Sequence, residues 1–121
     1  RSDVSTSDIV VTVDSCPPYA CWTTSVVLFP GTGLLDFWDK PWVDVHQVDP
    51  TQAAYVYVTA TYFCPGCWAP APWDSVITQD GSADKGATWY GAISLSAVPP
   101  TVPLVQLSRP IGGVGGNVLA C

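Results

Sequence analysis

The stretch Ala53–Trp68, which reads AAYVYVTATYFCPGCW, constrains the fold more than any other part of the chain. It holds no charged residue and no breaker before Pro65, and as far as Phe63 it consists mostly of Val, Thr, Tyr and Phe, which favour strands. At a period of two, one face is small and smooth, with Val56 and Val58, and the other is large and amphipathic. Neither face is charged, so we expect a central strand covered on both sides. A buried helix is the rival interpretation, against which the density of Thr, Tyr and Val argues.

The composition extends this preference to the whole chain. Twelve prolines and ten glycines interrupt its 121 residues, Met and Glu are absent, and Val and Thr are common. Good helix formers are therefore scarce and strand formers abundant. One domain is expected at this length. The sequence predicts an all-β fold, an antiparallel β-sandwich or jelly roll of about eight strands, with a barrel as the alternative.

Turn residues divide the chain into short strand candidates. Val43 and Val45 are expected to point inward, with Asp44 and His46 on the opposite face. Pro41 is expected to end the short, ambiguous segment that precedes it. The segment Leu34–Asp39 is left unassigned. The expected strands are Asp8–Asp14, Trp22–Phe29, Trp42–Val48, Ala53–Phe63, Trp73–Thr78, Ala87–Leu95 and Val102–Leu107, with Asn117–Cys121 as an optional last strand, a polar loop at Gln79–Gly86 and a flexible tail at Gly112–Gly116.

The charge balance argues against two classes of partner. The net charge is −6, every acidic residue is an Asp, and only four residues are basic. No patch can neutralise a phosphate backbone, so we expect no nucleic-acid binding, and anionic membrane surfaces are disfavoured for the same reason. No apolar run approaches the ~18 residues of a membrane span, so membrane insertion is not expected.

The sequence offers few candidate catalytic arrangements. The single histidine, His46, lies two residues from Asp44 on one strand face, but no GxSxG motif marks a nucleophilic serine, and a plain polar-face histidine is favoured. Paired acids such as Asp36 and Asp39 exist, although a glycosidase without Glu would need two tuned Asp residues. We therefore expect no enzymatic activity.

The cysteines allow several states. Cys64 and Cys67 form a CxxC and, with Cys16 and Cys21, could bind zinc, although the spacing is looser than that of a zinc ribbon. Reduced or locally paired thiols are favoured over zinc. A thioredoxin-like motif is disfavoured because WAPAPW, and not a helix, follows CPGC. Cys121 makes the count odd, which fits an intracellular chain better than a secreted disulfide scaffold.

Loop aromatics and loop acids are the candidates for receptor binding. Trp68 and Trp73 bracket a proline-rich connector, where burial is harder, and exposed aromatics suit the recognition of proteins or sugars. The alternative is that they cap the ends of the sandwich. Asp80 and Asp84 lie in a segment that resembles part of a calcium loop but lacks the EF-hand order of ligands, so a solvated hairpin loop is favoured there.

Two segments carry a resemblance to a known family. TATYFCPGCWAPAPW (59–73) and LSRPIGGVGGNVLAC (107–121), with the composition of the whole chain, resemble the protruding (P) domain of small non-enveloped RNA-virus capsids, most closely those of shrimp and prawn nodaviruses. The resemblance implies that residues 1–121 form a single protruding (spike) β-domain, the C-terminal part of a longer capsid protein. The Asp-rich calcium motif of fish nodavirus P domains is not clearly present, so no metal site is implied.

The same resemblance implies the function and the partners. P domains of that family pair into dimeric surface spikes and meet the host cell, so the expected partners are a second copy, the capsid shell domain of the same chain, and a host-cell receptor or glycan. The expected location is the virion surface, after assembly in the host cytoplasm. A secreted carbohydrate-binding or adhesin β-sandwich module is the alternative, and a hydrolase with an unrecognised site is a third class.

Self-association is also expected from the residues themselves. Charged residues make up only 12% of the chain, and both faces of Ala53–Phe63 need cover. A two-fold pair is the commonest closed arrangement and needs a single self-complementary patch. Tyr55 and Tyr57 are the candidates for that patch because tyrosine tolerates partial exposure and packs well in interfaces. The alternative places them under the segment Pro30–Trp42 of the same chain.

Overall fold

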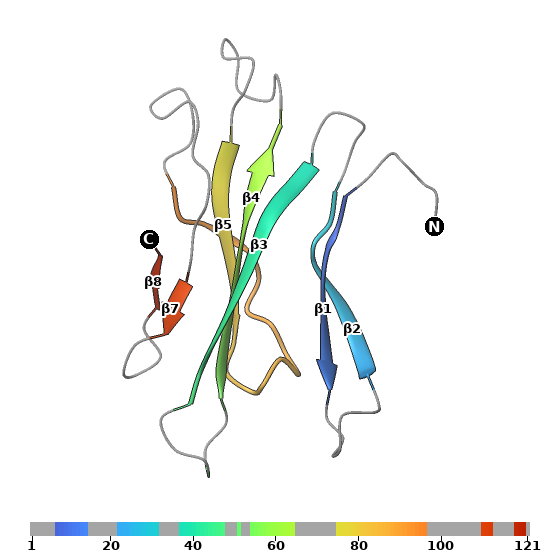
Figure 1. Cartoon of the computed structure of the whole chain (residues 1–121), viewed down its shortest axis with the longest axis vertical. Helices are drawn as coiled ribbons and strands as arrows, with labels where there is room; N and C mark the ends of the chain where they lie inside the picture. Colours follow the sequence, from blue (N-terminus) through green and yellow to red (C-terminus); the bar gives the residue numbers. More distant parts are fainter. Residues whose placement is uncertain are drawn as a thin grey trace.

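The computed structural model describes residues 7–14, 22–31, 37–47, 51, 54–64, 75–96, 110–112 and 118–120. These residues form antiparallel β-structure (Figure 1), as predicted, and no helix long and apolar enough to cross a membrane occurs among them. The strands are β1 (Ile9–Asp14), β2 (Trp22–Phe29), β3 (Phe37–His46), β4 (Tyr55–Phe63), β5 (Ser75–Ser82), β6 (Ile93–Ser94), β7 (Pro110–Gly112) and β8 (Val118–Ala120).

The strands pair in three groups. β1 and β2 form a hairpin, β3-β4-β5-β6 form a four-stranded sheet in that order, and β7 pairs with β8. Figure 1 shows the hairpin on one side of the sheet and the β7–β8 pair on the other, and β7 lies against β3 and β4.

β4 is the central strand that the sequence predicted. It pairs with β3 on one edge and with β5 on the other along most of its length. Val58 and Ala60 are buried on the face toward the hairpin, and Tyr57 and Thr59 are buried on the opposite face. The expectation that both faces of this uncharged strand are covered is confirmed.

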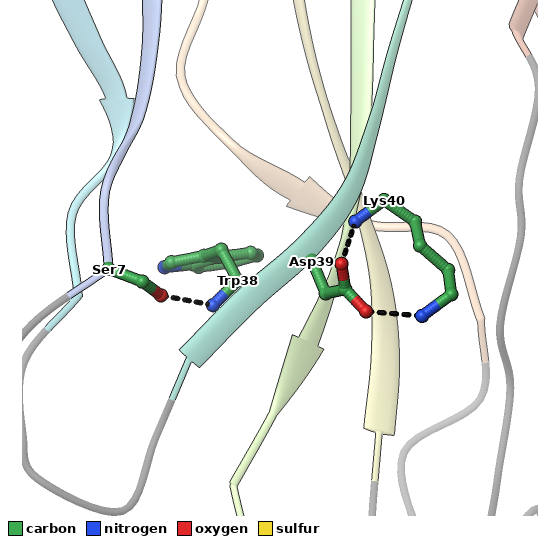
Figure 2. A network of polar contacts seen from close by, with 4 residues as sticks. All are labelled: Ser7, Trp38, Asp39 and Lys40. Carbon is green, nitrogen blue, oxygen red and sulfur yellow. Dashed lines mark hydrogen bonds and ion pairs between the residues drawn. The ribbon is translucent and has the colours of Figure 1, made fainter.

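The core joins the hairpin to the sheet. Leu28 and Phe29 of β2 pack against Val58 and Ala60 of β4, and the ring of Phe29 stacks on Trp38 of β3 with 4.9 Å between centroids. Hydrogen bonds fix the same junction. The backbone N–H of Trp38 donates to Ser7 Oγ (2.8 Å; Figure 2), and its indole N–H donates to the carbonyl of Pro30 (3.1 Å).

The prediction that Pro41 ends the ambiguous segment before it, and that a strand begins only at Trp42, is wrong. β3 continues from Phe37 to His46, and its register against β4 shifts between Asp39 and Trp42. Lys40 takes a left-handed conformation (φ 51°) at this bulge, which accommodates Pro41 on an edge strand. Lys40 also closes an ion pair with Asp39 (Figure 2), and its hydrogen bond is the main cause that lowers the pKa of the Asp39 carboxyl.

Two further boundaries differ from the prediction. β5 continues to Ser82, into the first half of the expected polar loop, because Gln79 and Asp80 are buried in the sheet. The strand expected over 87–95 is reduced to the two residues of β6, because side-chain hydrogen bonds hold most of this segment in an irregular loop. β7 reaches into the expected flexible tail, β8 lies within the expected last strand, and the strand expected over 102–107 lies outside the described residues.

Candidate functional site

An apolar groove runs between the hairpin and the sheet. Its volume is about 470 Å³, and its lining is apolar except for Asp8. Val58, a core residue of β4, contributes to it, so the groove reaches the core. The other lining residues are Ile9, Val10 and Val11 of β1 and Pro41, Trp42 and Val43 of β3.

The β3 side of this groove is unusually exposed for apolar side chains. Trp42, Val43 and Val45, which we call the β3 apolar edge, are 48%, 55% and 59% exposed. Val43 and Val45 lie opposite Val58 and Val56 in the β3–β4 register, so they share the face that the hairpin covers farther along the sheet. The prediction placed this alternation correctly, but its expectation that the two valines are buried is wrong.

β3 is also the terminal strand of the four-stranded sheet. It hydrogen-bonds to β4, and in the described part of the chain no strand pairs with its other side. The edge is accessible, since Pro41, Val43, Val45 and Gln47 are all exposed.

Tyrosines gather on the opposite face of the sheet. The rings of Tyr55 and Tyr57 are parallel, with 6.5 Å between centroids. Tyr90, from the loop after β5, is 70% exposed, and a side chain at Gly81 would come within 3.4 Å of the rings of both Tyr57 and Tyr90. Gly81 therefore leaves room for these two rings. We call Tyr55, Tyr57 and Tyr90 the tyrosine cluster.

The two predicted interface residues, Tyr55 and Tyr57, differ in how far their side chains are exposed. Tyr57 is only 4% exposed, and its burial, followed by the nearby Tyr55, Tyr90 and Asp44, raises the pKa of its phenol. Tyr55 is half-buried and lies opposite His46 of β3. Within one copy, Tyr57 thus packs as an interior residue, and Tyr55 retains some free surface.

Asp80 is a predicted receptor-binding residue that the structure buries. It is 4% exposed, and its Oδ1 accepts hydrogen bonds from the backbone N–H groups of Gly81 (2.7 Å) and Gly91 (3.0 Å). The N–H of Tyr90 also donates to the carbonyl of Gly81 (2.9 Å). Asp80 therefore fixes the loop that presents Tyr90, and its carboxylate does not face solvent.

Asp84, another predicted receptor-binding residue, organises the start of that loop. Its carboxylate accepts hydrogen bonds from the Thr88 N–H (2.8 Å), the Thr88 hydroxyl (2.7 Å) and the Ser82 hydroxyl (2.8 Å). These bonds, the Thr88 N–H first among them, lower the pKa of Asp84 to about 2. A carboxylate with these partners stabilises the loop by accepting its hydrogen bonds, a structural role that the calcium-like spacing did not predict.

The loop turns one aromatic inward and the next outward. Trp89 packs against the core, and its indole N–H donates to the carbonyl of Gly86 (3.1 Å). Gly86 has a positive φ of 88°, and a side chain there would come within 2.9 Å of Val13 Cγ2. Sequence reasoning missed Tyr90. The signal that could have found it is the aromatic pair Trp89-Tyr90 between Gly86 and Gly91.

The remaining predicted residues are four cysteines and two tryptophans, of which the structure describes only Cys64. Cys64 is buried and disulfide-bonded, and a sulfur in a disulfide is not a thiolate ligand, so zinc binding at Cys64 would require that bond to be reduced. Within the described ranges, no three His, Cys or Asp side chains come together as a metal site. Cys16, Cys21, Cys67, Trp68 and Trp73 lie outside the described residues.

His46 keeps an unusual polar atom. Its Nε2 is buried and has no hydrogen-bond partner among the residues that the structure describes. Asp44 precedes it on the same face, opposite Tyr57, so the sheet places a carboxylate and an imidazole in succession along β3. Comparison with known proteins adds no assignment, because no protein-family model, no curated protein and no solved structure matches this chain.

Proposed function

We propose that this chain is the protruding domain of a small non-enveloped RNA-virus capsid, of the shrimp and prawn nodavirus type. In this proposal it forms dimeric spikes on the virion surface and contacts a host-cell receptor. The segments 59–73 and 107–121 support it by their resemblance to that family. The acidic balance of the chain also fits a domain that leaves RNA to another part of the capsid.

The observation that carries the proposal is the β3 apolar edge. Trp42, Val43 and Val45 are about half exposed on one strand, beside a groove that reaches the core. Val43 and Val45 share one face, and Trp42 lies in register with Thr59, which belongs to the other. Exposed apolar surface of this kind is typical of interaction sites on soluble proteins, and full burial of one such side chain is worth about 1.5–3 kcal/mol. Self-association would cover this surface in each copy.

The finer architecture is part of the proposal. We infer an antiparallel β-sandwich or jelly roll of about eight strands, in which the hairpin and the four-stranded sheet are the packed layers. The contacts of Leu28 and Phe29 with β4 support it. A crystal structure would test it, and a closed barrel with continuous hydrogen bonding from β1 to β3 would contradict it.

One comparison of masses tests the class of protein. We expect the fragment to form a small oligomer in light scattering and the longer parent protein, with its shell domain, to form a particle. A parent protein that stays monomeric would argue against the capsid assignment.

The domain is also proposed not to be an enzyme and to be constrained by the disulfide of Cys64 and not by zinc. Metal analysis of the purified protein tests the absence of zinc.

Tyr90 favours a second candidate, a carbohydrate-binding or adhesin module. Its ring is 70% exposed on a loop held by Asp80 and Asp84, and exposed aromatics stack on sugars. Titration with methyl glucoside, methyl galactoside and methyl mannoside, followed by NMR, tests this candidate. Shifts confined to the tyrosine cluster and lost in Tyr90→Ala would support it, and no shift in the wild-type protein would count against it.

A further inference from the structure

We propose that the groove between the hairpin and the sheet binds a single-chain amphiphile with a cationic head, an alkylammonium in the simplest case. The apolar chain lies in the groove against Val43 and Val58, and the ammonium pairs with the carboxylate of Asp8. This inference goes beyond the proposed spike function and does not depend on self-association.

The size and the lining of the groove suit a small molecule. Its volume of about 470 Å³ lies within the ~300–1,000 Å³ that is usual for ligand pockets. Val58 of the core is 2% exposed, whereas Val10 of β1 and Val43 of β3 are 49% and 55% exposed. An apolar chain between β1 and β3 removes the surface of these two valines from water, which is the driving force for its binding.

Hydrogen bonds fix the end of the groove at Asp8. The Ser7 hydroxyl oxygen accepts a bond from the backbone N–H of Trp38 (2.8 Å; Figure 2), which ties the start of the hairpin to β3. Asp8 Oδ1 accepts a bond from the backbone N–H of Gly31 (2.9 Å). Gly31 approaches Ser7 so closely that a side chain there would come within 2.5 Å of the Ser7 carbonyl oxygen. These contacts hold the Asp8 carboxylate in place before a ligand arrives.

The charges around the groove favour a cationic head. Asp8 is charged, the other described lining residues are apolar, and Asp8 Oδ2 has no partner among the described residues. Lys40, the basic residue next to the β3 wall, pairs with Asp39 and lies over the ring of Phe63, on the face of the sheet opposite Val43. The net charge of −6 also favours a cationic ligand over an anionic one.

The order of the lining residues sets the direction of the ligand. Asp8 precedes Ile9, Val10 and Val11 on the hairpin, and all four line the groove, so the carboxylate lies at one end of an apolar wall. With its head at Asp8, an amphiphile extends its chain along β1 toward Val11. The reverse orientation would place the charged head among apolar side chains, where it would lose hydration without gaining a partner.

Isothermal titration calorimetry with a set of related probes tests the class of ligand. Decylammonium, used below the concentration at which it aggregates, should bind saturably. Decan-1-ol has the same chain without the charge and should bind roughly fivefold more weakly, and decanoate more weakly still. Butylammonium keeps the head but lacks most of the chain, so it should bind at least about 100-fold more weakly.

Asp8→Asn tests the contact with the head. The amide Oδ1 can still accept the bond from the Gly31 N–H, so the end of the groove is retained. Decylammonium should bind about fivefold more weakly to this variant, whereas the affinity for decan-1-ol should stay within about twofold. Asp84→Asn is the charge-matched control, because it removes a carboxylate that does not line the groove, and it should leave both affinities unchanged. Circular dichroism verifies that both variants fold.

A matched pair on β3 tests the contact with the chain. Val43 and Val45 lie on the same face and are similarly exposed, but only Val43 is among the described lining residues of the groove. Val43→Thr should weaken the binding of decylammonium and decan-1-ol about threefold, because a hydroxyl replaces a methyl group in the apolar contact. Val45→Thr should leave both affinities unchanged. Methyl NMR of the wild type should show ligand-induced shifts at Ile9, Val10, Val11, Val43 and Val58.

Three results would overturn the proposal. The first is the absence of saturable decylammonium binding to the wild type. The second is equal affinity for decylammonium, decan-1-ol and decanoate with no effect of Asp8→Asn, which would remove the cationic head from the ligand class. The third is equal weakening in Val43→Thr and Val45→Thr with methyl shifts away from the groove. None of these results decides whether the fragment forms dimeric spikes, which the comparison of masses tests separately.

Discussion

β3 and β4 are neighbours in one sheet, and both carry alternating valines, yet one is a surface strand and the other is interior. Val43 and Val58 lie directly opposite each other in the register, and they are 55% and 2% exposed. The difference arises from what lies above them. The hairpin places Leu28 and Phe29 over β4, and it leaves a groove where it faces β3. Burial in this sheet is therefore decided by the neighbouring layer and not by the alternation of the strand itself.

The largest effect is expected from truncating a side chain that covers β4. Phe29→Ala should lower the free energy of unfolding by about 3–5 kcal/mol, because it deletes a buried ring that packs on β4 and stacks on Trp38. Val27→Ala, at an exposed position on the same strand, should change it by no more than about 0.5 kcal/mol. Urea unfolding of the two variants checks the prediction. Equal effects would mean that β2 does not cover the sheet as described.

A second test makes the same substitution on both members of one cross-strand pair. Val58→Thr should lower the free energy of unfolding by about 1–3 kcal/mol, because the added hydroxyl is buried among apolar neighbours. Val43→Thr should cost less than about 0.5 kcal/mol in the monomer, because water reaches it. Unfolding at a protein concentration below the dissociation constant isolates the monomer. A large cost at Val43 would show that the groove is closed in solution.

The contrast also explains which features the sequence could predict. The bounds of β2 and the central position of β4 follow from uncharged, β-prone runs that end at Pro30 and near Pro65. The exposure of Val43 could not be predicted, because it depends on how far a hairpin distant in sequence extends over the sheet. The passage of β3 through Pro41 depends on a bulge that a period-two pattern cannot anticipate.

The candidate residues divide in the same way. Asp80 and Asp84 are polar and flanked by Gly and Ser, which is typical of an exposed loop, and only the folded chain reveals that their carboxylates accept bonds from the backbone around Tyr90. Tyr55 and Tyr57 alternate with valines as an amphipathic face should. Their different burial comes from Gly81 and Tyr90, which lie next to Tyr57 through the pairing of β5.

The smallest expected effect concerns the loop that supplies Trp89 to the core above β4. Hydrogen bonds to Asp84 lower the pKa of this carboxyl to about 2, below its ordinary value of 3.8. A depressed pKa in the folded state contributes stability that is present above the unfolded-state pKa and is lost as the pH falls through the folded-state pKa. The contribution of Asp84 should therefore be complete above about pH 4 and should disappear as the pH approaches about 2.

Thermal unfolding of the wild type and Asp84→Asn from pH 7 to pH 2 measures this contribution. The wild type should have the higher Tm at neutral pH, and the difference should shrink in the acid range, because protonation then removes the charge that the substitution already lacks. Asp3→Asn is the control, since it removes one Asp far in sequence from this loop. The tryptophan fluorescence of the folded protein should change over the same acid range in the wild type and not in Asp84→Asn, if the loop loosens and Trp89 loses its packing on Leu28 and Phe29. A constant Tm difference down to pH 2 would mean that the amide replaces the carboxylate as an acceptor equally well, and that the loop is held by hydrogen-bond geometry and not by charge.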